Sequence, residues 1–423
     1  MDRSDGSVVV ISALSLWSMG PGRGAPSLAL TLEGYALAGY RVHFIFGGPL
    51  GSEEISMPPG VLLHHFDCRL LRRGAATSKI GHLIRPLWWL YFQLLALFLG
   101  RRIARREEVL LFYGYEIMGV PAAWLLGRLL KRPTVSRFQG TVLAPWLDHP
   151  LWHLRWWHHV LALKTPTDLV IMTNDGTQGD RVLQALRVNT ARVRFWMNGV
   201  PSPVEVHPKM VESLRQQLGC RPEEKLLVTV SRLQRWKRVD RAIRALAELA
   251  AERNDVRLVV VGDGPERPHL ERLARSLGIA GRVVFVGSVA RTLVPLYLEA
   301  ADVFLSLYDL SNVGNPLLEA MRQGCCVVTL NVGATGEFLQ DGVNAILLDP
   351  EEIQRLPAVL SALVDDPQRR QELGQAAWRF ARDHIWTPEE RMAAELREVG
   401  QLIGQPEPNT FRDVERVVDR LAD

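Results

Sequence analysis

The sequence predicts an α/β fold of two domains, each built around a doubly wound parallel sheet. The chain has 423 residues, more than one ordinary domain contains. Apolar residues make up 47% and charged residues 23%, a composition typical of globular proteins. In both halves, short apolar runs alternate with helical patterns. This alternation indicates parallel strands that are joined by helices.

The first half begins with an apolar run, Val8–Ala13, that predicts a buried strand. A loop of glycine and proline follows, and then a helix is expected over Ser27–Ala38, ending near Gly39. Further strands are expected at Arg41–Phe46, Val109–Tyr113 and Pro133–Phe138, with a long helix over Leu83–Arg106. The order of these elements favours a parallel sheet.

The second half repeats the alternation of strands and helices. Lys225–Val230 predicts a strand and Val239–Arg253 an amphipathic helix. Further strands are expected at Arg257–Val261, Arg282–Val286, Val303–Leu307 and Cys326–Leu330. Residues 198–220 are rich in proline and charge, which indicates a domain junction. We expect one domain over 1–203, a second over 204–386, a helix near 387–403 and a tail over 404–423.

Charge is divided unevenly along the chain. Residues 1–200 contain 22 Lys and Arg against 13 Asp and Glu, so this part carries +9 while the remainder carries −5. A basic half indicates an anionic partner, such as phosphate, an anionic acceptor or a membrane surface. The sequence contains no helix-turn-helix or aromatic-basic RNA-binding pattern, so nucleic acid is not an expected partner.

Polar clusters follow several predicted strands of the second half, where open α/β sheets bind ligands. Ser231-Arg232-Leu233 comes directly after a strand, and Lys237 opens the next helix about one turn later. An Arg and a Lys beside a helix N-terminus favour binding of a diphosphate. The alternative interpretation is a solvated basic loop.

Two further clusters support a phosphate site. Gly262-Asp263-Gly264-Pro265 permits a tight turn with close backbone approach, although such turns are common. Asn315 is predicted as a helix N-cap and Pro316 as the first helical residue, which leaves N–H groups for a phosphate. Glu319, one turn later, suits a ribose diol; alternatively, it only favours the helix dipole.

Taken in order, these clusters resemble the retaining GT-B glycosyltransferases of family four, the glycosyl transferases group 1. The matching parts are Ser231-Arg232-Leu233 with Lys237 and Asp240, Gly262–Pro265, Leu317–Met321 with Gly324, Asn198-Gly199-Val200 and Trp386. The resemblance spans nearly the whole chain. It implies two Rossmann-like domains facing across a cleft, the first binding the acceptor and the second the nucleotide sugar. It also implies that the C-terminal helix returns to the first domain.

The resemblance implies that Arg232 and Lys237 are the catalytic cations that neutralise a departing nucleoside diphosphate. Because they take the place of a divalent cation, no metal or other cofactor is expected. The implied donor-binding residues are Gly22, Gly24, Ser231, Gly262, Gly264, Val289, Asn312, Gly314, Asn315, Pro316, Leu317 and Glu319. The implied reaction moves a sugar from a UDP or GDP donor to a glycan, lipid-linked or small-molecule acceptor.

The sequence departs from this family where the sugar and the acceptor would bind. The first of two family glutamates falls on Ser311, so Asp309 and Ser311 become donor-sugar candidates. Gln139 lies nearest one expected histidine position, and Tyr113–Glu116 occupies another, so Glu116, Arg137 and Gln139 become acceptor-side candidates. Glu116 is a candidate base or, alternatively, a polar residue whose hydrogen bonds are satisfied. These departures leave two alternatives open: a non-catalytic scaffold that binds nucleotide sugar, or another GT-B enzyme such as an epimerase or a phosphorylase.

The helix expected over Leu83–Arg106 is unusually apolar and ends in arginines. Arg85, Pro86 and Gln93 interrupt it as a membrane span. A core helix is the first interpretation, and an interfacial helix with its arginines on anionic lipid is the second.

The cysteines form no CxxC pair and the N-terminus lacks a signal-peptide pattern. We therefore expect a cytoplasmic protein, peripheral on the membrane in the second interpretation.

Overall fold

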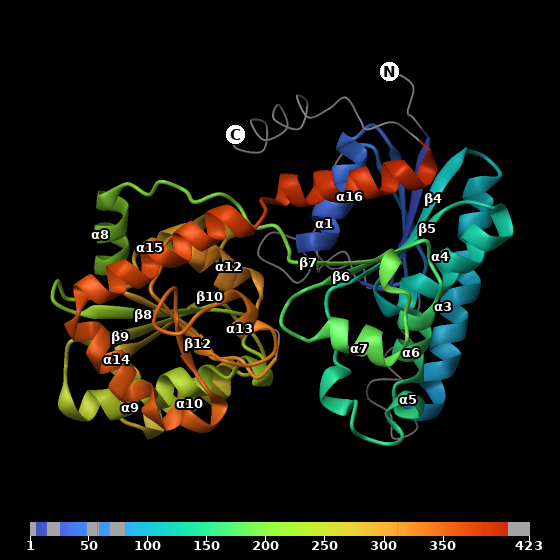
Figure 1. The fold of residues 1–423 in the computed structure, drawn as a ribbon. Helices are drawn as coiled ribbons and strands as arrows, with labels where there is room; N and C mark the ends of the chain where they lie inside the picture. The colour runs from blue at the N-terminus through green and yellow to red at the C-terminus, as the bar shows by residue number, and fades with distance from the viewer. Residues whose placement is uncertain are drawn as a thin grey trace. The chain divides into compact units, whose positions relative to one another are not determined.

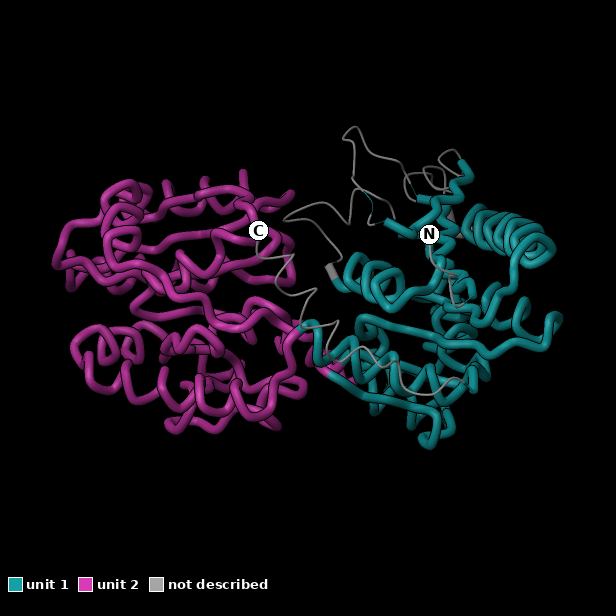
Figure 2. Tube along the Cα trace, turned by 90° about the horizontal axis from the view of Figure 1, so that it is seen from above, with its two compact units in different colours: residues 1–173, 179–196, 388–423 teal, residues 174–178, 197–387 magenta. Residues whose placement is uncertain are grey.

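A computed structural model of the chain describes residues 6–14, 26–48, 57, 59–67, 81–310 and 312–404. The chain forms two compact units, coloured separately in Figure 2. Unit 1 comprises residues 1–173, 179–196 and 388–423, and unit 2 comprises residues 174–178 and 197–387. Each unit contains one parallel sheet with helices packed on it (Figure 1). The predicted fold class is therefore confirmed.

Unit 1 contains a seven-stranded sheet, sheet A, in the order β3-β2-β1-β4-β5-β6-β7. Its strands are β1 (Ser7–Ser12), β2 (Arg41–Phe46), β3 (Val61–His65), β4 (Val109–Tyr115), β5 (Thr134–Phe138), β6 (Leu169–Thr173) and β7 (Val193–Trp196). All of its strand pairs are parallel. The strand order reverses between β1 and β4, and ligands of such sheets bind at the carboxyl ends of the strands beside this point.

The helices of unit 1 include its C-terminal segment. They are α1 (Pro26–Leu37), α3 (Gly81–Ala104), α4 (Glu116–Leu130), α5 (Trp152–Arg155), α6 (Trp157–Lys164), α7 (Gly179–Ala185) and α16 (Pro388–Ile403), with 3₁₀ turns η2 (Ala144–Trp146) and η3 (Thr190–Arg192). Helix α16 packs against α1 so closely that a Cβ atom on Gly34 would lie 2.4 Å from Cγ of Met392. The chain therefore closes unit 1 with residues far from its start.

Unit 2 contains a six-stranded sheet, sheet B, in the order β10-β9-β8-β11-β12-β13. Its strands are β8 (Lys225–Val230), β9 (Val256–Val261), β10 (Val283–Gly287), β11 (Val303–Ser306), β12 (Val327–Leu330) and β13 (Ile346–Leu348). Strands β8, β9, β11 and β12 are buried along nearly their whole length, because helices cover both faces of the sheet. The strand order reverses between β8 and β11.

The helices of unit 2 connect these strands. They are α8 (Pro208–Gln217), α9 (Val239–Glu252), α10 (Arg267–Ser276), α11 (Val294–Glu299), α12 (Asn315–Arg322), α13 (Thr335–Phe338), α14 (Leu356–Asp365) and α15 (Pro367–His384). The 3₁₀ turns are η4 (Arg235–Lys237), η5 (Ala280–Arg282), η6 (Arg291–Leu293) and η7 (Pro350–Arg355). Helix α9 buries Ile243, Leu246 and Leu249, which recur at helical spacing.

The predicted elements match the observed ones closely where apolar runs are continuous. The strands expected at Arg41–Phe46 and Lys225–Val230 coincide with β2 and β8. Strands β3, β6, β7 and β13 were not predicted. The segment 198–220, expected as a junction, contains α8, and the compact units divide at 196/197.

Candidate functional site

The loops that follow β8 and β9 in unit 2 are joined by backbone hydrogen bonds. The N–H of Ser231 donates to Val261 O at 3.0 Å, and the N–H of Leu233 donates to Asp263 O at 2.9 Å. A Cβ atom on Gly262 would lie 1.9 Å from Ser231 O, and one on Gly264 would lie 2.5 Å from Leu233 O. Both predicted glycines are therefore needed for these loops to meet at the carboxyl edge of sheet B.

Two aromatic rings hold the ammonium group of Lys237. Its Nζ lies 3.7 Å from the ring centroid of Tyr308 and 4.1 Å from that of Trp236. The two rings meet edge to face, with an interplanar angle of 82°. The Tyr308 hydroxyl donates to Val230 O at 2.9 Å, and the N–H of Asp309 donates to Trp236 O at 2.9 Å. Cation–π attraction thus fixes Lys237 beside the ends of β8 and β11.

The electrostatics of Lys237 depend on its neighbours in unit 2. Burial lowers the pKa of Lys237 to about 7, and the positive charge of Arg232 also lowers it. The carboxylate of Asp175 opposes both effects. Arg232 itself is exposed. The two predicted catalytic cations are therefore close enough to influence each other, and a bound anion would favour the charged form of Lys237.

Asp175 reaches this group through the short segment 174–178, which belongs to unit 2. The N–H of Val313 donates to Asp175 O at 3.0 Å. Gly176 has a φ of +88°, and a Cβ atom there would lie 3.0 Å from the amide nitrogens of Asn312 and Val313. Gly333 also approaches this segment closely, because a Cβ atom on Gly333 would lie 2.0 Å from Gly176 O. The segment is therefore locked against the loop before α12.

Sequence reasoning missed Asp175, Trp236 and Tyr308 as parts of the site. A signal for Asp175 was present, because Asn174-Asp175-Gly176 follows β6 in the same way that the predicted clusters follow their strands. No local signal indicates that two aromatic residues distant in sequence enclose one lysine. Asn312, which was predicted, is 1% exposed, and its Oδ1 has no hydrogen-bond partner among the described residues.

The start of α12 differs by one position from the prediction. Gly314, in an extended conformation, is the N-cap, and Asn315 is the first helical residue rather than the cap. The Asn315 Oδ1 instead accepts from Asn198 Nδ2 at 3.2 Å. Pro316 has no N–H, and the Leu317 N–H donates to Gly314 O at 3.0 Å. Among the described residues, the amides of Gly314 and Asn315 are thus the ones left for an anion.

Glu319 lies one turn into α12 and pairs with Arg291. The distance from Glu319 Oε1 to Arg291 Nη2 is 3.4 Å, and the carboxylate side chain is 17% exposed. Burial raises the pKa of Glu319, and Arg291 opposes this shift. Val289, which follows β10, is partly buried against core residues of unit 2. Glu319 and Val289 therefore border the carboxyl edge of sheet B.

Several candidates are engaged elsewhere or lie outside the described residues. Asp309 forms ion pairs with Arg241 at 2.7 Å and with Arg238 at 3.3 Å, so two guanidinium groups already neutralise its carboxylate. The predicted residues outside the described part of the chain are Gly22, Gly24 and Ser311.

The acceptor-side candidates belong to unit 1 and do not share one environment. Glu116 begins α4 with a φ of 62°, and its Oε1 accepts from the N–H of Gln139 at 2.7 Å. The structure therefore brings Glu116 and Gln139 together at the carboxyl edge of sheet A. Arg137 is only 4% exposed and donates to Thr31 at 2.6 Å. The prediction that Arg137 contacts an acceptor is therefore wrong, because its guanidinium is buried in the core of unit 1.

Metal-ligating side chains do not gather within the described ranges. No three His, Cys, Asp or Glu residues there are placed to hold a metal ion. The chemistry available at the edge of sheet B comes from Arg232, Lys237, the amides at the start of α12 and the carboxylates of Asp175 and Glu319. This set suits an anionic ligand that carries hydroxyl groups.

The chain is similar to known glycosyltransferases. The family model of glycosyl transferases group 1 matches residues 210–380, which lie in unit 2. An alpha-D-kanosaminyltransferase of Streptomyces kanamyceticus is 26% identical over 68% of this chain and 74% of its own length. A GDP-mannose-dependent alpha-(1-6)-phosphatidylinositol monomannoside mannosyltransferase of Mycolicibacterium smegmatis is 33% identical over 43% of this chain, and the match spans about half (49%) of that relative.

Among solved structures, Anabaena Alr3699/HepE in complex with UDP and glucose aligns with a TM-score of 0.68. The alignment covers 92% of this chain and 99% of the other, at 20% identity. At this identity, the likeness is one of fold, and it extends over both units.

Proposed function

We propose the reaction that this chain catalyses from its GT-B fold and from the match of its residues 210–380 to the glycosyl transferases group 1 family. It moves a sugar from a nucleoside diphosphate to an acceptor, without a metal ion and with retention of anomeric configuration. The observation that carries the proposal is the placement of Lys237 between Trp236 and Tyr308, next to Arg232.

Charge on the leaving group explains why these cations matter. Transfer breaks the bond between the anomeric carbon and the β-phosphate oxygen, and the electron pair stays on the diphosphate. Positioned cations in a partly dehydrated site stabilise that charge as it develops. The acceptor oxygen bonds to the same carbon and passes its proton to the departing phosphate on the same face, so a pair of catalytic carboxylates is not required.

Glu319 and the start of α12 complete the donor site in this proposal. Carboxylate oxygens accept hydrogen bonds from a ribose diol, and the amides of Gly314 and Asn315 suit a phosphate oxygen. The relatives named above act with GDP-mannose or bind UDP, so either nucleotide is a candidate donor. A donor screen by mass spectrometry identifies the base and the sugar.

Binding of the diphosphate tests the site directly. UDP or GDP should raise the melting temperature of the chain, and Arg232→Ala should abolish that rise. Arg235→Ala is the matched control, because Arg235 is an exposed arginine of the adjacent 3₁₀ turn η4. An unchanged rise in Arg232→Ala would refute the site. Turnover of labelled nucleotide sugars with a lipid extract then tests transfer.

A membrane-bound acceptor is favoured by the outer face of α3. Five large apolar side chains are exposed there: Leu87 (60%), Leu90 (49%), Tyr91 (38%), Leu94 (57%) and Phe98 (62%). The opposite face is buried through Phe92, Ala96 and Ile103. One face of the helix is thus core, as the first interpretation expected, while the other remains uncovered. None of the helices in the described part of the chain is both long and apolar enough to span a bilayer.

The surroundings of this face suit an anionic lipid surface. Arg101 and Arg102 are exposed one turn beyond Phe98. On α6, which lies beside α3 in Figure 1, Trp157 is 37% exposed, and its ring lies 5.5 Å from that of Trp89. Apolar and aromatic side chains flanked by arginines are typical of helices that lie in the interface of a bilayer. We therefore propose peripheral membrane binding and a lipid-linked acceptor.

Flotation with vesicles tests this surface. The chain should float with vesicles of phosphatidylglycerol and phosphatidylcholine, and Leu94→Glu with Phe98→Glu should keep it at the bottom of the gradient. The matched control replaces Met210 and Val343, two exposed apolar residues of unit 2, by glutamate. Equal flotation of the α3 variant and the parent would overturn membrane docking through α3, without affecting the donor site.

A further inference from the structure

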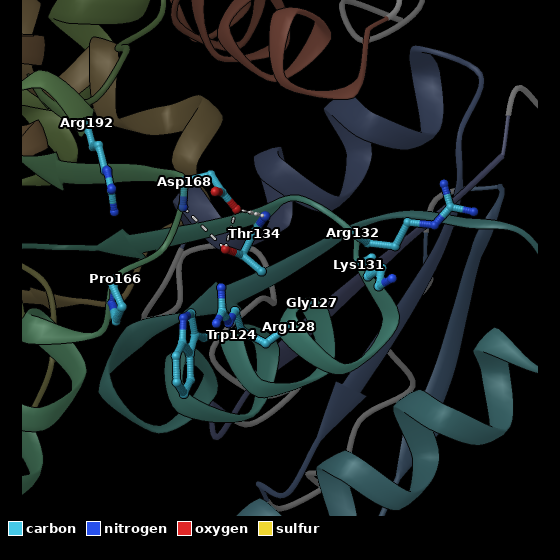
Figure 3. A pocket seen from close by; sticks show the side chains of 9 residues that line it. All are labelled: Trp124, Gly127, Arg128, Lys131, Arg132, Thr134, Pro166, Asp168 and Arg192. Carbon is cyan, nitrogen blue, oxygen red and sulfur yellow. Dashed lines mark hydrogen bonds between the residues drawn. The ribbon is translucent and has the colours of Figure 1, made fainter.

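A basic cavity lies at the amino edge of sheet A in unit 1 (Figure 3). It has a volume of about 490 Å³. The residues that line it are Trp124, Gly127, Arg128, Lys131, Arg132, Thr134, Pro166, Asp168 and Arg192. They come from the last turns of α4 and from the residues that begin or precede β5, β6 and β7. Glu116 and Gln139 lie at the opposite, carboxyl edge of the same sheet, so the cavity is distinct from the acceptor-side candidates.

Three of the four positive charges that line the cavity have no partner among the described residues. Arg128, Lys131 and Arg192 make no side-chain hydrogen bond or ion pair within the described ranges. Arg132 pairs at 3.4 Å with Glu108 and extends away from the others in Figure 3. Like charges that converge on one cavity repel each other unless an anion joins them.

The one carboxylate among the residues that line the cavity accepts hydrogen bonds from a neighbouring strand. Asp168 Oδ2 accepts from both the N–H and the hydroxyl of Thr134, each at 2.8 Å (Figure 3). It forms no ion pair with the four cations. The carbonyl end of α4 attracts cations of its own last turn, which accounts for Arg128 and Lys131. It does not account for Arg192, which comes from η3 and approaches the cavity from the opposite side.

We propose that this cavity is a second anion site, which binds a phosphate or diphosphate group. Two guanidinium forks, those of Arg128 and Arg192, match the oxygens of a phosphate, and Lys131 adds a point charge. Trp124 and Pro166 supply an apolar wall for a small body attached to the phosphate (Figure 3). The volume lies within the range of small-molecule sites. The phosphate belongs either to a soluble metabolite or to a lipid headgroup.

Calorimetric titration with inorganic pyrophosphate at low ionic strength tests the site. All proteins carry Arg232→Gln, which removes the donor site of unit 2 from the measurement. Arg128→Gln with Arg192→Gln should weaken binding by about tenfold or more, the loss expected for charge-assisted hydrogen bonds. Arg272→Gln with Arg275→Gln removes the same charge from exposed positions of α10 in unit 2 and should change affinity less than about twofold. Absence of saturable binding, or equal losses in both pairs, would overturn the proposal for a soluble ligand.

Flotation with vesicles of phosphatidylglycerol distinguishes a soluble metabolite from a lipid headgroup as the source of the phosphate. If the cavity variant loses pyrophosphate binding but still floats, the ligand is a soluble phosphate compound. If pyrophosphate does not bind and the cavity variant alone loses flotation, the ligand is a lipid headgroup; both results support a phosphate site. If neither pyrophosphate binding nor flotation distinguishes the cavity variant from the Arg272/Arg275 control, the cavity is not an anion site. Arg192→Gln alone, at an exposed position, replaces the double variant if that one does not fold.

Discussion

The carboxylate of Glu395 lies 3.2 Å from the guanidinium of Arg137, and neither side chain is more than 5% exposed. Glu395 also accepts from the Tyr113 hydroxyl at 2.7 Å and pairs with Arg391 at 3.2 Å. One buried carboxylate therefore compensates two guanidinium groups. Because Glu395 and Arg391 are on α16 while Arg137 and Tyr113 are on sheet A, this group ties the C-terminal helix to unit 1.

Removal of Glu395 should destabilise unit 1 strongly. Glu395→Ala leaves two buried guanidinium groups uncompensated, which costs about 3–5 kcal/mol in comparable sites. Urea unfolding, followed by hydrogen exchange of peptides from α16 and β5, measures the loss. Glu398→Ala is the matched control on the same helix: its pair with Arg194 is partly exposed and should contribute about 0–1 kcal/mol. Similar losses in both variants would show that the buried group does not anchor α16.

The pH dependence of donor binding follows from Lys237. Burial lowers its pKa to about 7 from an ordinary value of 10.5. The unfolded chain therefore holds more protons between these values, and the free protein should become more stable as pH rises through this range. A diphosphate instead requires the charged lysine, so UDP or GDP binding should weaken above pH 7, by up to about tenfold per pH unit.

Titration calorimetry in buffers of different ionisation enthalpy checks this dependence. Proton uptake on UDP binding should approach one at pH 8.5, where the phosphates, with a pKa of about 6, no longer titrate. Lys237→Met should bind UDP more weakly, with little proton uptake. A flat affinity profile from pH 7 to 9 in the parent protein would contradict the role of Lys237.

The sequence predicted the parts of the site that are local. Ser231, Arg232 and Lys237 follow β8 within a few residues, and the apolar run of β8 defines where they begin. It did not predict contacts that depend on tertiary packing. Arg137 looked available to an acceptor because its partner Glu395 lies 258 residues away. Asn315 looked like a helix cap because asparagine is favoured there, yet Gly314 takes that position and Asn315 contacts Asn198.

Glu319 and Asp309 should differ in their effect on donor binding. Glu319→Gln removes a charged hydrogen-bond acceptor from the ribose, so the donor KM should rise about tenfold or more. Asp309→Asn should change it by less than about threefold, because Arg238 and Arg241 already hold that carboxylate. Steady-state kinetics with the intact donor and with analogues that lack the 2′ or the 3′ hydroxyl of the ribose separates the effect of Glu319 from that of Asp309. If Glu319→Gln discriminates against the deoxy analogues as strongly as the parent does, Glu319 does not bind the ribose.

Chelation of divalent metal should leave transfer unchanged. In the proposed reaction, the positive charges of Arg232 and Lys237 neutralise the leaving diphosphate, so the charge of a metal ion is not required. Turnover in excess EDTA should therefore agree with turnover in Mg²⁺ or Mn²⁺ within about twofold. As a control, added Mg²⁺ should not restore Arg232→Ala, because the described residues offer no carboxylate cluster to hold the ion there. Turnover that is lost in EDTA and restored by Mg²⁺ would instead show that a metal neutralises the leaving group. Lys237 would then only bind the donor.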